Sequence, residues 1–218
     1  MRELAPGDIK YKDLNDDGVI DANDQCYLGK SWFPSWSYGM GFNINYHNFD
    51  LALFFQGVSD VSIMANGGSI DTGNGDWGAS GVGIVPFTGM GLNPSNVITK
   101  ALDRWTADNP RADAWYPRMT ANATTNDNNY VNSTHWLKDG SYLRLKQASL
   151  GYTLENKKLM DKGIEYLYFY LSGQNLLTFS KFKLWDPELG SNGAKYPLSR
   201  MVTLGTVSYT HLTLPTKA

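Results

Sequence analysis

The sequence has little of what several common protein classes need. It holds one cysteine, Cys26, which excludes a framework of internal disulfides. No apolar run approaches the roughly 20 residues of a transmembrane helix, although membrane-spanning β-strands hide their apolar residues at every second position. The formal net charge of −2 argues against nucleic acid or an anionic membrane surface as the main partner.

The chain also lacks the residue arrangements of common catalytic sites. Its three histidines are scattered at positions 47, 135 and 211, and no Ser/His/Asp arrangement, paired carboxylates or glycine-rich phosphate loop accompanies them. We therefore expect that the chain is not an enzyme. The first residues, Met1 to Pro6, have no apolar stretch of a signal peptide, so the chain is either cytoplasmic or without its true N-terminus.

What the sequence does have is a long alternation from Ser35 to Tyr46, in which small or polar residues separate large ones. The large residues are Trp36, Tyr38, Met40, Phe42, Ile44 and Tyr46. Strand side chains point alternately to opposite faces, so the pattern predicts a strand with one apolar and one polar face. Such a strand reaches roughly 40 Å, or roughly 28 Å of height at a 45° tilt, enough to cross an outer membrane. A soluble β-sandwich strand is the alternative, although those strands are usually shorter.

Further strands with matched alternation follow. A two-residue turn at His47-Asn48 leads into a second strand with Phe49, Leu51, Leu53 and Phe55 on one face, which predicts a β-hairpin. Patterning resumes over 142–154, where the leucines change phase and a β-bulge near Lys146-Gln147 would reconcile them. After a short polar turn over 155–163, strands are predicted at 166–175 and from Arg200.

The connections between these strands differ greatly in length. Residues 58–141 lose the regular pattern and are rich in Gly, Ser and Asn, with one expected amphipathic helix capped by Asn96 and carrying Val97, Ile98, Ala101, Leu102 and Trp105 on one face. Such a loop fits an outer-membrane barrel, whose external loops are long and whose periplasmic turns are short. Placing the segment before Ser35 outside puts every long connection outside and every short one in the periplasm.

A calcium loop is predicted between Asp13 and Asp24. Oxygen-bearing side chains occupy positions one, three, five, nine and twelve, and Gly18 at position six permits the sharp turn. Position twelve is an aspartate where the full motif has a bidentate glutamate, so we expect a weak structural site. The alternative is an Asx-rich turn without an ion. The expected ligands are Asp13, Asn15, Asp17, Asp21, Asp24 and the backbone carbonyl of Val19.

Four ordered segments resemble the SusC/RagA family of TonB-linked outer-membrane transporters. They read PGDIKYKDLNDDGVIDANDQ, YHNFDLALFFQG, WLKDGSYLRLKQASLGYTL, and SGQNLLTFSKF followed by WDPE and YPLSR. The resemblance implies an all-β fold, made of the C-terminal antiparallel strands of a large transmembrane β-barrel of about 22 strands with long extracellular loops. It implies that residues 1–206 are a part of the barrel, without plug domain and earlier strands. Residues 207–218 differ from the family's aromatic last strand and look like a non-native, adapter-derived tail.

The same resemblance implies a function and partners. It implies a nutrient importer in the outer membrane of a Gram-negative, Bacteroidetes-like bacterium, which takes up oligosaccharides or peptides. TonB would power uptake through the missing N-terminal part, a SusD-like surface lipoprotein would act as the lid, and outer-membrane lipid would surround the strands. Four loop tryptophans are candidate contacts to sugar or lid, with loop packing as the competing role; they are Trp77, Trp105, Trp115 and Trp136. The alternative function is a secreted, calcium-stabilised β-sandwich that binds carbohydrate.

Overall fold

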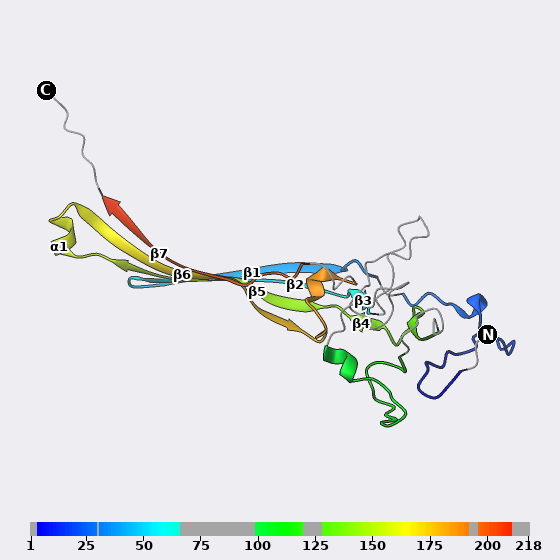
Figure 1. The fold of residues 1–218 in the computed structure, drawn as a ribbon. Coiled ribbons are helices and arrows are strands. Elements are labelled where there is room, and N and C mark those ends of the chain that lie inside the picture. The colour runs from blue at the N-terminus through cyan, green and yellow to red at the C-terminus, as the bar shows by residue number, and fades with distance from the viewer. Residues whose placement is uncertain (1–3, 30, 66–98, 120–127, 192–195, 211–218) are drawn as a thin grey trace. The chain divides into compact units, whose positions relative to one another are not determined.

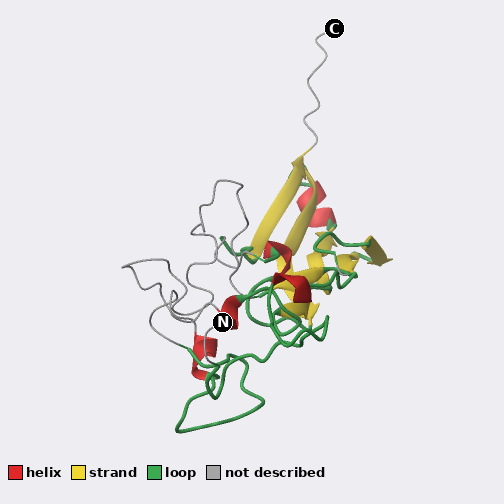
Figure 2. Ribbon diagram, turned by 90° about the vertical axis from the view of Figure 1, so that its right-hand side faces the viewer, coloured by secondary structure: helices red, strands yellow, loops and turns green. Residues whose placement is uncertain are grey.

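The computed structural model describes residues 4–29, 31–65, 99–119, 128–191 and 196–210. The chain divides into two compact units, which we call the sheet unit (Trp36–Ser59, Tyr142–Ser180 and Leu198–Ala218) and the loop unit (Met1–Ser35, Asp60–Ser141 and Lys181–Pro197). Strands dominate, and the described helices are single turns (Figure 2). None of the helices among these residues is long and apolar enough to cross a membrane.

The sheet unit is one antiparallel sheet of five strands (Figure 1). They are β1 (Trp36–Tyr46), β2 (Phe49–Ser59), β5 (Tyr142–Leu154), β6 (Ile164–Ser180) and β7 (Met201–Thr210), and they lie side by side in this order. The predicted hairpin is confirmed, because Tyr46 pairs with Phe49 across the turn. His47 adopts a φ of 51° there, as a tight two-residue turn demands.

The register places most of the large apolar residues on one face of the sheet. Directly opposed residues of antiparallel strands lie on the same face. One row therefore crosses all five strands as Ile44, Leu51, Leu150, Leu171 and Leu204. The adjacent row, on the other face, runs Asn45, Asp50, Gly151, Tyr170 and Gly205. The predicted separation into an apolar and a polar face is confirmed in β1, and these two rows carry it across the sheet, although Phe54 and Val207 lie on the polar face.

The predicted bulge in β5 is also confirmed. Phe54 of β2 pairs with Gln147, and the next residue, Phe55, pairs with Leu145, so Lys146 is the extra residue. The pairing of β5 with β6 shifts at the same point. Because one residue is skipped, Leu143 and Leu145 return to the face that carries Leu150.

The connections between strands are short at one end of the sheet and long at the other. The turn at 47–48 and the segment 155–163 join strands at one end, while the connections 60–141 and 181–200 and the segment before Trp36 join the other end. The segment 155–163 contains the single turn α1 (Lys157–Met160), which Asn156 caps by accepting a hydrogen bond from the N–H of Lys158 at 3.0 Å. This division agrees with the predicted distribution of long and short connections.

The loop unit holds the hydrophobic core of the described residues. This unit contains a two-stranded sheet of β3 (Ser62–Met64) and β4 (Leu137–Asp139). It also contains the single turns η1 (Ala22–Asp24), η3 (Thr99–Leu102), η5 (Asn128–Tyr130) and η6 (Pro187–Leu189). The buried cluster consists of Ile63, Ala65, Tyr116, Trp136 and Phe182.

Three expectations from the sequence were wrong. Strand β6 does not end at Asn175: this residue takes a φ of 54° where the pairing is irregular, and the strand then continues to Ser180. Asn96 to Ile98 lie outside the described residues, and the amphipathic helix is otherwise only the turn η3, in which Ala101 is buried but Leu102 is 77% exposed. Asp8 to Lys12, whose sequence DIKYK also predicts the end of a strand, form no strand, because the N–H and the carbonyl of Ile9 bind the side chains of Asn129 and Asn128 instead.

Strand β7 extends beyond the point where we placed the end of the native sequence. Its last residues, 207–210, pair with β6 up to Thr210, which lies opposite Ile164. Four residues of the segment set apart as a tail therefore extend the strand, although Val207 and Tyr209 lie on the face that carries Gly205 and not on the face of Leu204. Their foreign origin stays a prediction.

Candidate functional site

The acidic loop is folded by its own side chains. The carboxylate of Asp13 accepts hydrogen bonds from the N–H groups of Asp16 and Gly18 at 2.7 and 2.8 Å. Asp24 closes the loop by accepting from the N–H groups of Leu14 and Asp21 at 2.7 and 2.8 Å. Gly18 has a φ of 80°, so the sharp turn falls at the position that the motif reserves for glycine.

The predicted calcium ligands have suitable chemistry, but their side chains do not converge. In the part of the chain that the structure describes, no three Asp, Glu, His or Cys side chains form a metal-binding group. Instead, Asp17 and Asp21 also accept backbone N–H groups, at 2.8 and 2.7 Å. A carboxylate oxygen keeps a further lone pair after one hydrogen bond. The hydrogen bonds from Leu14 and Asp21 hold the pKa of Asp24 below its usual range, so this carboxylate is charged at neutral pH. The calcium site stays a prediction.

A buried polar network fastens the N-terminal segment to the loop core. Asp8, only 4% exposed, accepts two hydrogen bonds from the guanidinium of Arg118, both at 2.9 Å, and one from the amide of Asn129 at 2.8 Å. Burial raises the pKa of Asp8, but hydrogen bonds from Arg118, the Ala5 N–H and Asn129 outweigh it, so the pKa lies below 3.8. Asn129 also accepts from the N–H of Ile9 at 2.8 Å. Sequence reasoning missed this network because its partners lie more than a hundred residues apart.

The candidate tryptophans separate into different roles. Trp136 is fully buried and donates its indole N–H to the carbonyl of Asn129 at 2.9 Å, so it packs the loop core and does not contact a ligand. The ring of Trp105 lies against Gly7, leaving no room for a Cβ at that glycine. Trp77 lies outside the described residues. Trp115 lines a pocket.

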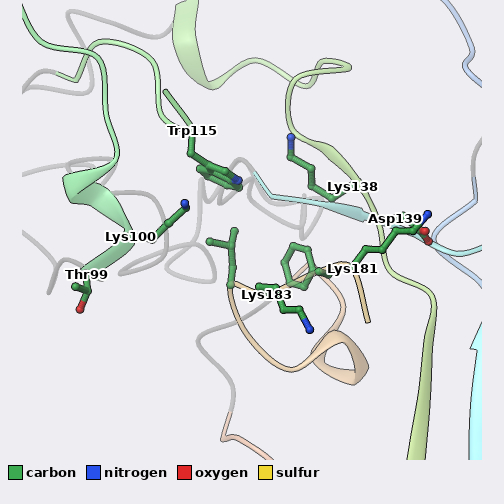
Figure 3. A pocket seen from close by; sticks show the side chains of 9 residues that line it. Thr99, Lys100, Trp115, Lys138, Asp139, Lys181 and Lys183 are labelled. Atoms are coloured by element: carbon green, nitrogen blue, oxygen red, sulfur yellow. The ribbon is translucent and has the colours of Figure 1, made fainter. Parts of the chain in front are cut away.

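This pocket has a volume of about 660 Å³ and lies within the loop unit (Figure 3). Its walls combine positive charge with aromatic rings. The lining side chains that matter chemically are Lys100, Lys138, Lys181, Lys183, Trp115, Phe182 and Asp139. Such a combination suits an anionic ligand with an apolar body. The sequence offered no signal for it, because the four lysines come from three separate segments.

The polar face of the sheet carries aromatic rings over glycines. Tyr168 donates its O–H to Asp50 at 2.9 Å, and its ring is stacked on that of Tyr170 at 5.9 Å. A Cβ at Gly151 would collide with Tyr168, and one at Gly205 would collide with Tyr170. The glycines of the polar face therefore make space for rings of neighbouring strands.

These features define the class of protein. A single antiparallel layer with one apolar and one polar face, and with long connections at one end and short ones at the other, has the organisation of a transmembrane β-barrel wall. A β-sandwich needs a second comparable sheet, whereas the other described sheet has two strands of three residues each.

Comparisons with known proteins specify this class further. No family model matches the chain. It is 30% identical over 215 residues to TonB-dependent receptor P26 and 29% identical over 216 residues to TonB-dependent receptor P3, both of Formosa agariphila, with 91% and 92% of the chain covered. The chain spans 19% of the length of each of these relatives.

Comparison with solved structures points to the same class of protein. The match to the RagAB peptide importer in its 'open-open' state covers 86% of this chain and 18% of the importer's chain, with a TM-score of 0.59 and 24% sequence identity. The match to its 'closed-closed' state covers 87% of this chain and 20% of the importer's chain, with a TM-score of 0.54 and 25% sequence identity. The chain is thus a relative of the TonB-dependent receptors and is SusC/RagA-like in fold. Its curated relatives are receptors and not enzymes, in agreement with the expectation that the chain is not an enzyme.

Proposed function

We propose that the chain forms part of the wall and the external loops of a TonB-dependent importer of oligosaccharides or peptides. The observation that carries this proposal is the continuous apolar row from Ile44 to Leu204, which crosses all five strands and matches a surface that lies against lipid. The polar row beside it, from Asn45 to Gly205, would face the aqueous lumen. The relatives' names support the same activity for the complete protein.

The proposal includes a location and partners. The complete protein would lie in the outer membrane of a Gram-negative, Bacteroidetes-like bacterium, as its Formosa relatives suggest. TonB would energise it through a segment outside this chain. The name RagAB denotes a two-component importer, and a SusD-like surface lipoprotein would be the corresponding lid here.

Deleting the gene of the complete transporter tests this function. Cells are given a mixed pool of oligosaccharides and oligopeptides, and depletion of each from the medium is followed by mass spectrometry. We expect uptake of one class to stop on deletion, to return with the intact gene and to stop again when the proton-motive force is collapsed. Unchanged uptake in the deletion strain, or uptake that continues after the proton-motive force has been collapsed, would refute the proposal.

We also propose that the acidic loop takes calcium as a structural ion. Asp13, Asp17, Asp21 and Asp24 place four like charges within twelve residues, and a cation would relieve their repulsion. Asn15 and the carbonyl of Val19 would complete the set of ligands. The hydrogen bonds to Asp13 and Asp24 support the proposal, since they fold the loop around its ends. With aspartate at position twelve, we expect affinity on the order of 10⁻⁴–10⁻³ M, as in extracellular modules.

Protease cleavage of this loop in the intact transporter tests the ion. Chelator and Asp17→Ala should each speed cleavage, while Asp108→Ala, at an exposed aspartate outside the loop, should not change it. If chelator and Asp17→Ala both leave the cleavage rate unchanged, the loop is an Asx turn without calcium.

A further inference from the structure

Positive charge gathers in the loop-unit pocket although the chain as a whole is slightly acidic. The sequence has a formal net charge of −2, yet the described lining of the pocket holds four lysines against one aspartate, Asp139. The lysines are Lys100, Lys138, Lys181 and Lys183. Like charges gathered around one cavity repel one another, so an anion entering the cavity would be attracted by all of them.

Two of these lysines have carboxylates close by. The ammonium of Lys100 forms an ion pair with Asp103 at 2.6 Å, and Arg111 binds the same carboxylate. The side chains of Lys181 and Asp139 lie next to each other in the close view (Figure 3). Within the described residues, Lys138 and Lys183 form no ion pair. Their charges are therefore the least compensated in the pocket.

Lys138 is the best placed of the two. It comes from β4, and its ammonium lies 5.4 Å from the centre of the Trp115 ring (Figure 3). Lys138 is partly buried, and this burial lowers the pKa of its ammonium. His135 adds no charge nearby, because burial and then the charge of Lys138 lower its pKa. A desolvated ammonium gains more from a bound anion than a fully hydrated one.

The aromatic part of the lining is held firmly. The Trp115 ring packs edge-on against Tyr116 and Trp136, with centroids 4.4 and 5.6 Å apart. Phe182 belongs to the buried core and packs edge-on against Trp185 at 4.7 Å. Because these rings are fixed by the core, they form a prepared apolar wall of the pocket, with Trp115 beside the ammonium of Lys138. A sugar ring or an aliphatic chain would pack on this wall.

We propose that this pocket binds a carboxylate group of the molecule that the transporter imports. The carboxylate would pair with Lys138, the other lysines would add to the positive potential, and the adjoining ring or chain would lie against Trp115 and Phe182. The identity of the ligand as cargo rests on the proposed import function. An acidic sugar and an acidic peptide present the same chemistry, so the experiment includes both.

The test measures binding to the intact, detergent-solubilised transporter by calorimetry. The probes are an oligogalacturonate and an oligoglutamate, each beside a neutral counterpart of equal length, a glucose oligomer and a serine oligomer. We expect one acidic probe to bind, and Lys138→Gln to weaken it roughly ten- to a hundredfold, as loss of a hydrogen bond to a charged group does. Lys138→Arg should restore most of the affinity. Lys12→Gln, at an exposed lysine of the same unit outside the pocket, should leave it unchanged.

The outcomes separate the pocket from the import function. Binding by the sugar probe or by the peptide probe alone identifies the source of the carboxylate. Neutral probes that bind as tightly as acidic ones, absence of binding by both acidic probes, or equal affinity in Lys138→Gln would overturn the proposal even if cells import neutral cargo. Lys138-dependent binding without uptake by cells would support the pocket and refute import. Retention of the heat-modifiable barrel band on gels shows that each variant is folded.

Discussion

The sheet unit and the loop unit are stabilised in different ways. In the sheet unit, main-chain pairing runs unbroken across five strands, while large apolar side chains such as Phe42 and Leu204 are 44% and 78% exposed. In the loop unit, Trp136 and Tyr116 are fully buried, and the carboxylate of Asp8 is paired with the guanidinium of Arg118. The sheet unit therefore needs an apolar environment from outside the chain, whereas the loop unit buries its own core.

The largest expected effect concerns the chain by itself. Expressed alone, the 218-residue chain should aggregate or require detergent, because the apolar face and the outer strands β1 and β7 would be exposed to water. Size-exclusion chromatography with light scattering, with and without detergent, measures this. A monodisperse monomer that melts cooperatively in plain buffer would contradict the membrane assignment of the sheet.

Trp136→Ala should affect the loop unit alone. Removing a fully buried tryptophan costs about 3–5 kcal/mol, so amides near it, such as that of Ala65, which donates to the Trp136 carbonyl at 2.9 Å, should lose hydrogen-exchange protection. Trp32→Ala, at a ring that is 69% exposed, is the control and should change stability by less than about 0.5 kcal/mol. Loss of protection in β2 and β5 as well would mean that the two units are not independent.

Phe42→Arg should affect the sheet unit in a membrane-dependent way. An arginine on the lipid side near mid-membrane costs about 2–4 kcal/mol, whereas Asn43→Arg, one position along β1 on the polar face, should cost far less. Unfolding of the intact transporter from lipid vesicles measures the difference. Equal costs for the two substitutions would show that the faces are wrongly assigned.

Asp8→Asn should weaken the loop unit and change its response to acid. The substitution keeps the shape but removes the charge that Arg118 binds, at a cost of about 1–3 kcal/mol. Because the folded pKa of Asp8 is below 3.8, its stabilising contribution is present above that value and is lost as the pH falls through the folded pKa.

Hydrogen exchange of the loop unit over about pH 5 to about pH 2 tests this linkage. The variant should lose less stability than the wild type across this range, while Asp108→Asn, at an exposed aspartate, should behave like the wild type. Parallel acid profiles for wild type and Asp8→Asn would exclude Asp8 as the titrating group.

The smallest expected effect lies on the polar face of the sheet. A Cβ in Gly205→Ala would meet the outer end of the Tyr170 ring, which must move, at a cost of about 1 kcal/mol. Gly41→Ala is the matched control, because the nearest atom, on Phe54, would be 3.7 Å away. Unfolding from lipid vesicles should show the difference, and equal stabilities would indicate that the Tyr170 ring is freely mobile.

Features with a local cause could be predicted from the sequence. The alternation in β1 and β2, the turn at His47-Asn48 and the bulge at Lys146 follow from side-chain period and turn geometry, which neighbouring residues express directly. The continuation of β6 past Asn175 was missed, because the irregular residue breaks the alternation while pairing with β5 carries the strand onward. Leu102 was misplaced because periodicity alone does not show which side of a single turn meets the core.

The sequence by itself determined where the five strands of the large sheet lie, apart from the end of β6, the two faces of β1, and the acidic loop with its glycine turn. Only the tertiary structure decided that Trp136 is core while Trp115 lines a pocket, and that Lys100, Lys138 and Lys183 surround the same cavity. The physical reason is the range of the interactions. Strand alternation follows from backbone geometry within a few residues, whereas burial and the gathering of charges depend on which distant segments pack together.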